Sequence, residues 1–284
     1  MTTTLDRPPA PPQRSEGARV LLWFGAILGA LMLAAGAYSL VNLLVYTNGD
    51  PSTVVGTASY DAAPVVEIVA DGDITVTTGD TGVDVERTSR TASTEAKYTA
   101  SLSGERLIVK HTCDWWRPGF CTAGLNVRVP EGTEVVVRAS DGSVEATSLT
   151  GPLTIRTSDG STVVEDVSGD VSLHASDGSV SIDDVRGDVD ARTSDGWIDV
   201  SRVTGEVSTH TENGHTTVEA VEGDIDARAS DGDVTVYGNG EPVALTIAAR
   251  DGSQTVDAPT DPNASVKVGI HTADGDASYL GPRS

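Results

Sequence analysis

The sequence predicts an all-β protein, a β-solenoid of the parallel β-helix type with 18-residue coils, preceded by one transmembrane helix. The first observation is a repeat, because Asp-Gly or Asn-Gly returns every 18 residues without insertion. A second glycine follows each pair nine residues later in five successive units. A fixed period of this length is typical of repeat architectures. The pairs begin at Asp141, Asp159, Asp177, Asp195, Asn213 and Asp231.

The second observation is alternation, because apolar and polar residues take turns between the glycines, as in half-buried strands. The third is that the apolar positions match from unit to unit. One column is Val144, Thr162, Val180, Ile198, Thr216 and Val234, and the next is Ala146, Val164, Ile182, Val200, Val218 and Val236. An antiparallel sandwich or meander is the alternative, since Asp-Gly also favours hairpins. Equal unit lengths and matching columns favour parallel stacking, in which each coil bonds to its neighbours.

The N-terminal region predicts a membrane anchor. Residues 1–19 are rich in Pro and Thr and are expected to form a disordered cytoplasmic tail. Residues 20–46 are uncharged and mostly apolar, long enough to span a bilayer as a helix. Arginines precede this run, and the next basic residue is Arg87, so the positive-inside rule places the C-terminal domain outside the cytoplasm. A cleaved signal peptide is the alternative, because Ala35-Gly36-Ala37 resembles a cleavage site.

The remainder divides into three parts. Residues 47–63 read as a linker. Residues 64–138 contain strand-like runs and are expected to form the N-terminal part of the solenoid, with a disulfide-bearing hairpin excursion. Residues 139–282 hold the repeats and, where the period loosens after residue 232, a distorted C-terminal cap.

Two cysteines and a group of aromatics fall close together. Cys113 and Cys121 enclose a turn sequence, and a disulfide is expected outside the cytoplasm. The segment between them holds Trp115, Trp116, Arg117 and Phe120, in a chain that is only 4% aromatic. Scarce aromatics on a stapled loop suit a rigid contact site. The alternative is that they cover an open end of the solenoid.

Two polar columns run along the predicted coils. The acidic column contains Asp141, Asp159, Asp177, Asp195 and Asp231. It is interpreted as turn chemistry, in which each Asp bonds to its own backbone, and the alternative is a calcium ladder. The basic column contains Arg156, His174, Arg192, His210 and Arg228. It is interpreted as charge balancing on a solvated face, and the alternative is a stripe for an anionic cell-wall polymer.

Composition excludes several partners. The net charge is −23, with only three lysines, which argues against nucleic acid and against an anionic lipid surface. The sequence contains no phosphate loop, nucleophile elbow or metalloprotease motif, and no cofactor or metal site is predicted. Five coils of equal length offer no long loops to wall a cleft, so flat faces are expected rather than an active site.

The run from EIVADGDITV through LNVRVPEGTEVVV to the repeated SDGSV and GDV units resembles a bacterial adhesin-like, β-strand-repeat domain family of unknown function, DUF4097. The resemblance covers about residues 64–280 and implies a β-solenoid, frequently membrane-tethered, without established catalytic residues.

These observations favour a structural or interaction module of the cell envelope, anchored through residues 20–46, with a cell-wall polymer or an envelope protein as partner. The alternatives are a glycan-active enzyme on the same scaffold and an envelope-stress sensor acting through a partner.

Overall fold

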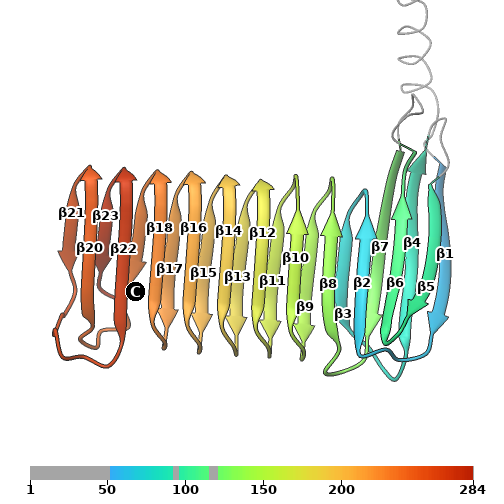
Figure 1. Cartoon of the computed structure of the whole chain (residues 1–284), viewed down its shortest axis with the longest axis horizontal. Coiled ribbons are helices and arrows are strands. Elements are labelled where there is room, and N and C mark those ends of the chain that lie inside the picture. Colours follow the sequence, from blue (N-terminus) through green and yellow to red (C-terminus); the bar gives the residue numbers. More distant parts are fainter. Residues whose placement is uncertain (1–51, 92–95, 115–120, 284) are drawn as a thin grey trace, which may run out of the picture. The chain divides into compact units, whose positions relative to one another are not determined.

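The computed structural model describes residues 52–91, 96–114 and 121–283. They belong to one compact unit, built from two β-sheets that face each other across a shared core (Figure 1). In order across the sheet, sheet A contains β1 (Ser52–Tyr60), β4 (Val83–Thr91), β7 (Cys121–Val129), β3 (Ile74–Thr78), β9 (Val144–Leu149), β11 (Thr162–Val167), β13 (Val180–Val185), β15 (Ile198–Val203), β17 (Thr216–Val221), β19 (Val234–Tyr237), β23 (Ala277–Leu280) and β21 (Gln254–Asp257). Sheet B contains β20 (Ala244–Asp251), β22 (Lys267–Asp274), β18 (Ile225–Asp231), β16 (Val207–Asn213), β14 (Val189–Asp195), β12 (Val171–Asp177), β10 (Leu153–Thr157), β8 (Glu134–Ala139), β2 (Val65–Ala70), β6 (Arg106–Thr112) and β5 (Lys97–Ser103).

The repeats stack in parallel, and each 18-residue coil gives one strand to each sheet. Val180 of β13 lies opposite Thr162 on one side and Ile198 on the other, as the repeat period predicts. The same register continues in sheet B, where Val189 lies between Val171 and Val207. The parallel solenoid is therefore confirmed over an antiparallel meander.

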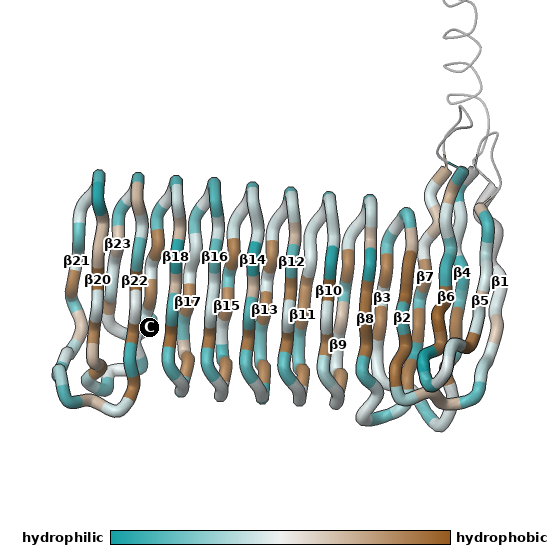
Figure 2. Tube along the Cα trace, in the orientation of Figure 1, coloured by the Kyte–Doolittle hydropathy of each residue, from teal (hydrophilic) through white to brown (hydrophobic). Residues whose placement is uncertain are grey.

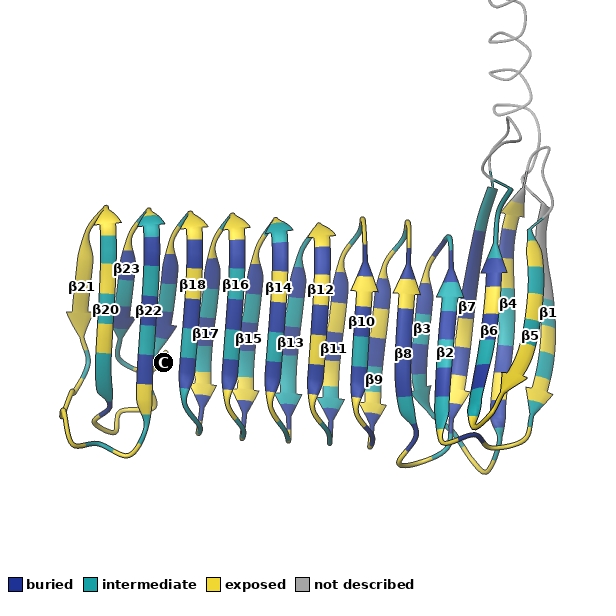
Figure 3. Ribbon diagram, in the orientation of Figure 1, coloured by how far each residue is buried: buried dark blue, intermediate teal, exposed yellow. Residues whose placement is uncertain are grey.

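The interior is a thin layer of small side chains between the two sheets. Buried residues alternate with more exposed ones along the repeat strands (Figure 3), and apolar segments recur from coil to coil (Figure 2). Ile182 and Val200 are almost fully buried, as the columns predict. The largest fully buried side chain is Tyr279, in β23. β-branched residues suit this layer because they pack well on a pleated surface.

Glycine marks both corners of each coil. The Asp-Gly corner carries the chain from sheet B to sheet A, and the second corner, which holds the second glycine, carries it back. At the second corner a Cβ added to Gly187 would lie 2.6 Å from the carbonyl oxygen of Gly169 in the preceding coil. Real Cβ atoms do not approach an oxygen so closely, so the coils can stack at this spacing only without a side chain here.

The repeat strands of sheet A, from β9 to β17, each bend at one position, and this bend was not predicted from the sequence. Ser148, Asp166, Asp184, Arg202 and Ala220 all have φ between 51° and 55°, although none is glycine. The pairing skips this residue on both strands, so the bends stack in register. The bend shifts the alternation by one residue, which is why Val164 and Val167 both point inward.

The N-terminal end is closed by antiparallel strands. β1 pairs with β4 and β4 with β7 in sheet A, while β5 pairs with β6 in sheet B. The hydroxyls of Tyr60 and Tyr98 lie 2.7 Å apart, and the Arg87 guanidinium lies 4.4 Å from the centre of the Tyr98 ring. Residues 52–60, expected to be linker, are therefore part of this closing layer, and the expectation was wrong for them.

The C-terminal end departs from chain order. After β19 the chain moves outward to form the outermost coil, β20 and β21, and then returns to fill the gap with β22 and β23. β22 therefore pairs with β18 on one side and β20 on the other, all in parallel. We call the coil of β22 and β23 the inserted coil, because it lies between two coils that precede it in the chain. The irregular spacing after residue 232 reflects this insertion.

The predicted tail and anchor, residues 1–19 and 20–46, lie outside the described residues. Within the described ranges, no helix has the length and apolarity that a membrane span requires.

Candidate binding face

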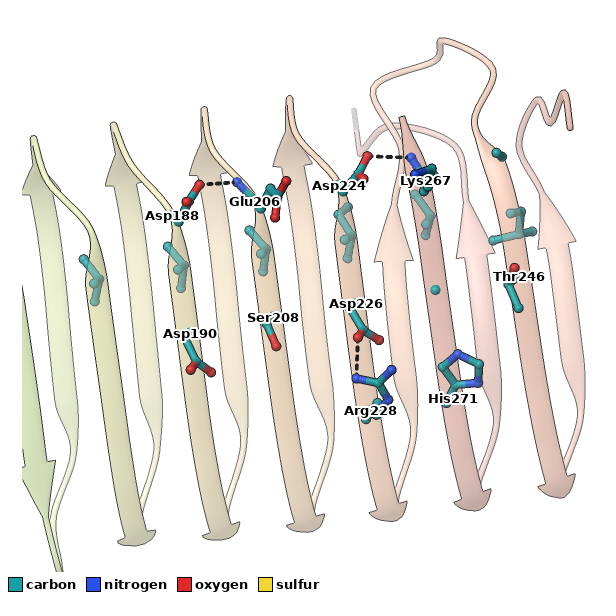
Figure 4. Close-up of a pocket in the computed structure, with 18 of the residues that line it drawn as sticks. Asp188, Asp190, Glu206, Ser208, Asp224, Asp226, Arg228, Thr246, Lys267 and His271 are labelled. Atoms are coloured by element: carbon teal, nitrogen blue, oxygen red, sulfur yellow. Dashed lines mark hydrogen bonds and ion pairs between the residues drawn. The ribbon is translucent and has the colours of Figure 1, made fainter. Parts of the chain in front are cut away.

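An open trough runs along the outer face of sheet B where its strands begin (Figure 4). It has a volume of about 1210 Å³ and is lined by residues from β10, β12, β14, β16, β18, β22 and β20, and by Val256 of β21. Thr260, Pro262 and Ala264, in the segment between β21 and β22, also line it. Most of the lining comes from the equal coils, and the irregular segment between β21 and β22 adds to it, so the expectation of flat faces was wrong for sheet B.

A row of acidic residues follows the second corner along one edge of the trough. Asp170 Oδ1 accepts a hydrogen bond from the backbone N–H of Asp188 at 3.0 Å, and Asp188 Oδ1 accepts one from Glu206 N–H at 2.8 Å. Asp224 Oδ1 accepts the N–H of Lys267, at the start of β22, at 2.8 Å. Each carboxylate therefore satisfies a donor of the next coil and also makes this edge negative. Figure 4 shows the last two of these bonds.

The predicted basic column forms one continuous row on this face. Strand register places Arg156, His174, Arg192, His210 and Arg228 opposite one another in successive coils. The same register adds Arg138 before Arg156 and His271 after Arg228. Arg138 stands 18 residues before Arg156, so the period could have found it. His271 follows Arg228 only because of the inserted coil, and no spacing rule in the sequence identifies it.

Carboxylates partly neutralise the row. Arg192 pairs with Asp190 at 2.6 Å, and Arg228 pairs with Asp226, two residues earlier on its own strand. Arg106 and Arg138 both bind Glu67, at 2.9 and 3.0 Å, and the hydrogen bond from Arg106 lowers the pKa of Glu67 most strongly. The Arg192 and Arg228 pairs are exposed, and such pairs contribute little stability. Arg156 follows Thr154 rather than an acid, and makes no ion pair with any described residue.

The predicted acidic column lies at the Asp-Gly corners, on the other edge of the sheets. Asp141, Asp159, Asp177, Asp195 and Asp231 are exposed there. Their side chains make no bond to their own turns within the described structure, contrary to the expected turn chemistry. Instead, glycines with φ from 99° to 141° form these corners, and Asn213 Nδ2 donates to Asp195 Oδ1 at 2.9 Å. Within the described ranges, no three His, Cys, Asp or Glu side chains are grouped to hold a metal ion.

Cys113 and Cys121 form a disulfide, with their Cα atoms 6.0 Å apart, as predicted. It does not sit on a hairpin, however, because β6 belongs to sheet B and β7 to sheet A. The bond closes the corner between two sheets, and Asp71 Oδ2 accepts the N–H of Cys113 at 2.8 Å beside it. The proposed contact residues Trp115, Trp116, Arg117 and Phe120 lie outside the described residues.

Stacked parallel coils define the class of this protein, a two-sheet β-solenoid with a long trough on the outer face of sheet B. The Toastrack DUF4097 family matches residues 65–280. The chain belongs to this family, and the family resemblance found in the sequence is confirmed.

Several solved structures match this chain at low sequence identity and low TM-score. One is a "putative cell adhesion protein" from Clostridium sporogenes, with 8% identity, a TM-score of 0.30, and coverage of 81% of this chain and 100% of that one. Another is a "putative lipid binding protein" from Parabacteroides distasonis, with 12% identity, a TM-score of 0.36, and coverage of 84% and 96%. A third is a "putative adhesin" from Bacteroides fragilis, with 12% identity, a TM-score of 0.29, and coverage of 81% and 99%. No curated protein compared with this chain matches it.

Proposed function

We propose that this chain is a single-pass, membrane-anchored module of the bacterial cell envelope. Its N terminus is cytoplasmic, its solenoid is extracytoplasmic, and the solenoid binds an extended partner along the trough of sheet B. The uncharged run at residues 20–46 and the arginines before it support the anchor and its orientation. The acidic solenoid and its disulfide are consistent with an oxidising compartment outside the cytoplasm.

The trough carries this proposal. Its floor repeats from coil to coil, with Ser172, Asp190, Ser208 and Asp226 at one position on successive strands. Coils stack at a spacing of about 4.8 Å, so an elongated partner meets a similar surface at every step. A cell-wall polymer or an extended segment of an envelope protein has this shape. Repeat proteins commonly bind partners on such continuous surfaces.

The carboxylates of the trough favour binding over catalysis. Asp170, Asp188 and Asp224 accept backbone N–H groups of neighbouring coils. Asp190 and Asp226 pair with arginines on their own strands. General acid–base chemistry needs two such groups facing one substrate atom with separated pKa values, whereas these groups are engaged by the scaffold.

Retention on envelope fractions tests the trough. The fragment 47–284 is incubated with cell-wall and membrane fractions, and the bound share is measured by sedimentation. Ser208→Trp places a bulky side chain on the floor of the trough, and we expect it to weaken retention about tenfold, which corresponds to 1.4 kcal/mol. Val163→Trp, on the outer face of sheet A, is the matched control and should leave retention unchanged. Equal retention of both variants would contradict a role for the trough.

Fractionation of cells tests the anchor. The full chain should sediment with membranes and resist alkaline carbonate extraction, while the fragment 47–284 should be released. Release of the full chain by carbonate would refute an uncleaved transmembrane helix.

A further inference from the structure

One corner position departs from the repeat on sheet A, the face opposite the trough. The residue after the Asp-Gly glycine is serine at Ser143, Ser161 and Ser179, and it immediately precedes a strand of sheet A. In the next two coils this position holds Trp197 and His215. The substitution places two ring side chains on adjacent coils, before β15 and β17.

The two rings form an ordered pair at the surface. Their planes differ by 4°, their centroids are 6.3 Å apart, and Trp197 is 41% exposed. Stacking turns one face of the indole toward His215. The coil on the other side of Trp197 carries Ser179 at this position, a side chain much smaller than an indole. A flat apolar surface is therefore held open in a fixed orientation, which lowers the entropy cost of binding.

Polar groups surround this platform. Asp199 stands two residues after Trp197 and is half-buried. Burial raises the pKa of Asp199 most strongly, the charge of Glu219 raises it further, and Arg283 and His215 oppose the rise. Arg283 pairs with Glu219 at 3.2 Å and lies 4.2 Å from the centre of the Tyr237 ring. The cluster thus offers an aromatic face, hydrogen-bond acceptors and one fixed donor.

We propose that Trp197, His215 and Asp199 form a binding site for a neutral glycan. The apolar C–H face of a pyranose ring stacks on the free face of the Trp197 indole, and neighbouring hydroxyls donate to the Asp199 carboxylate. Ligand sites combine an apolar surface with a few placed polar groups in this way. The excess of carboxylates disfavours an anionic sugar. This site lies on the other sheet and does not depend on the trough.

Titration calorimetry on the full chain, with cellohexaose and maltohexaose as probes, tests the proposal. At least one probe should bind with a Kd of about 1 mM or tighter. Trp197→Ser restores the residue of the three preceding coils and should weaken binding at least tenfold, while Trp197→Phe should retain part of the affinity. Val163→Ser removes another exposed apolar side chain from sheet A and should change nothing.

Two results would overturn the site. One is the absence of binding by either probe, and the other is equal affinity of the wild type, Trp197→Ser and Trp197→Phe. Binding of tetramethylammonium in place of both oligosaccharides would reassign the platform to cations and also refute the glycan. Ser208→Trp separates the two proposals, because it should weaken retention at the trough about tenfold while leaving oligosaccharide affinity intact.

Discussion

Replacing Gly187 by alanine should destabilise the solenoid, although alanine is the smallest possible addition. The new Cβ would lie 2.6 Å from both the carbonyl carbon and the carbonyl oxygen of Gly169. To restore an ordinary contact of about 3.4 Å, one coil must retreat from the other by about 0.8 Å. The added Cβ is fixed to its own Cα, and the atoms that it meets are backbone atoms of Gly169, so no side chain can rotate away to relieve the contact.

That movement would break two bonds at the corner. Arg186 N–H donates to Val167 O at 2.8 Å, and Asp188 N–H donates to Asp170 Oδ1 at 3.0 Å. A shift of this size stretches both beyond hydrogen-bonding range. Each contributes about 1 kcal/mol, and a group left unpaired costs more, so we expect a loss of about 2–4 kcal/mol. For a unit of this size, the melting temperature should fall by roughly 5–10 °C.

Gly269→Ala is the matched control. It lies in β22 with no positive φ, and its added Cβ would meet Asp226 Oδ1 at 3.5 Å, an ordinary contact. Thermal melts followed by circular dichroism should therefore place this variant within about 2 °C of the wild type. If Gly187→Ala melts no lower than Gly269→Ala, the close stacking of corner glycines does not limit coil spacing.

Four further predictions concern other parts of the chain. Thr211→Val should raise the free energy of unfolding by about 1 kcal/mol, because the buried Thr211 hydroxyl has no hydrogen-bond partner within the described structure. The control Thr235→Val, on the outer face of its strand, should not raise the free energy of unfolding. Burial lowers the pKa of His111 below its usual 6.5, so the unfolded chain binds more protons than the folded chain as the pH falls. The free energy of unfolding should therefore decrease from about pH 7 toward pH 5. His111→Leu should flatten this pH dependence, measured by urea titrations. Millimolar calcium should leave the melting temperature unchanged, because the acidic column is solvated turn surface, and a saturable rise would establish a calcium ladder. Trp115→Ala combined with Trp116→Ala should reduce envelope retention at unchanged stability if the loop is a contact site, whereas a large loss of stability would identify these rings as a cap.

The repeat region could be predicted because one coil determines the next. Once Val180 is placed, an 18-residue shift gives its neighbours Thr162 and Ile198, and the structure has both. The bends at Asp166 and its equivalents had a signal as well, since the apolar spacing changes from two to three residues between Val164 and Val167. A strict alternation of inward and outward residues does not include such a step, but in this chain the step recurs in successive coils.

The ends and the trough could not be predicted from local pattern. Residues 52–60 lack a strong apolar alternation, and they become a strand only through pairing with Val83–Thr91, far along the chain. Part of the trough is lined by a segment, residues 258–266, whose position follows from the inserted coil. Trp197 was visible as a departure from serine, but its partner His215 gains meaning only when the register places the two side by side.

The position of the inserted coil also determines how the C-terminal end is assembled. β20 and β21 occupy the outermost place, yet their neighbours in both sheets are β22 and β23, which are synthesised after them. Before β22 and β23 fold, no described strand lies beside the outermost coil, and the coil of β18 and β19 has an open edge. A growing chain can add coils one at a time only as far as Tyr237, and everything beyond it must join in one concerted step. The C-terminal end is therefore gained or lost cooperatively, and the middle coils can begin to fray from that side only after it has opened.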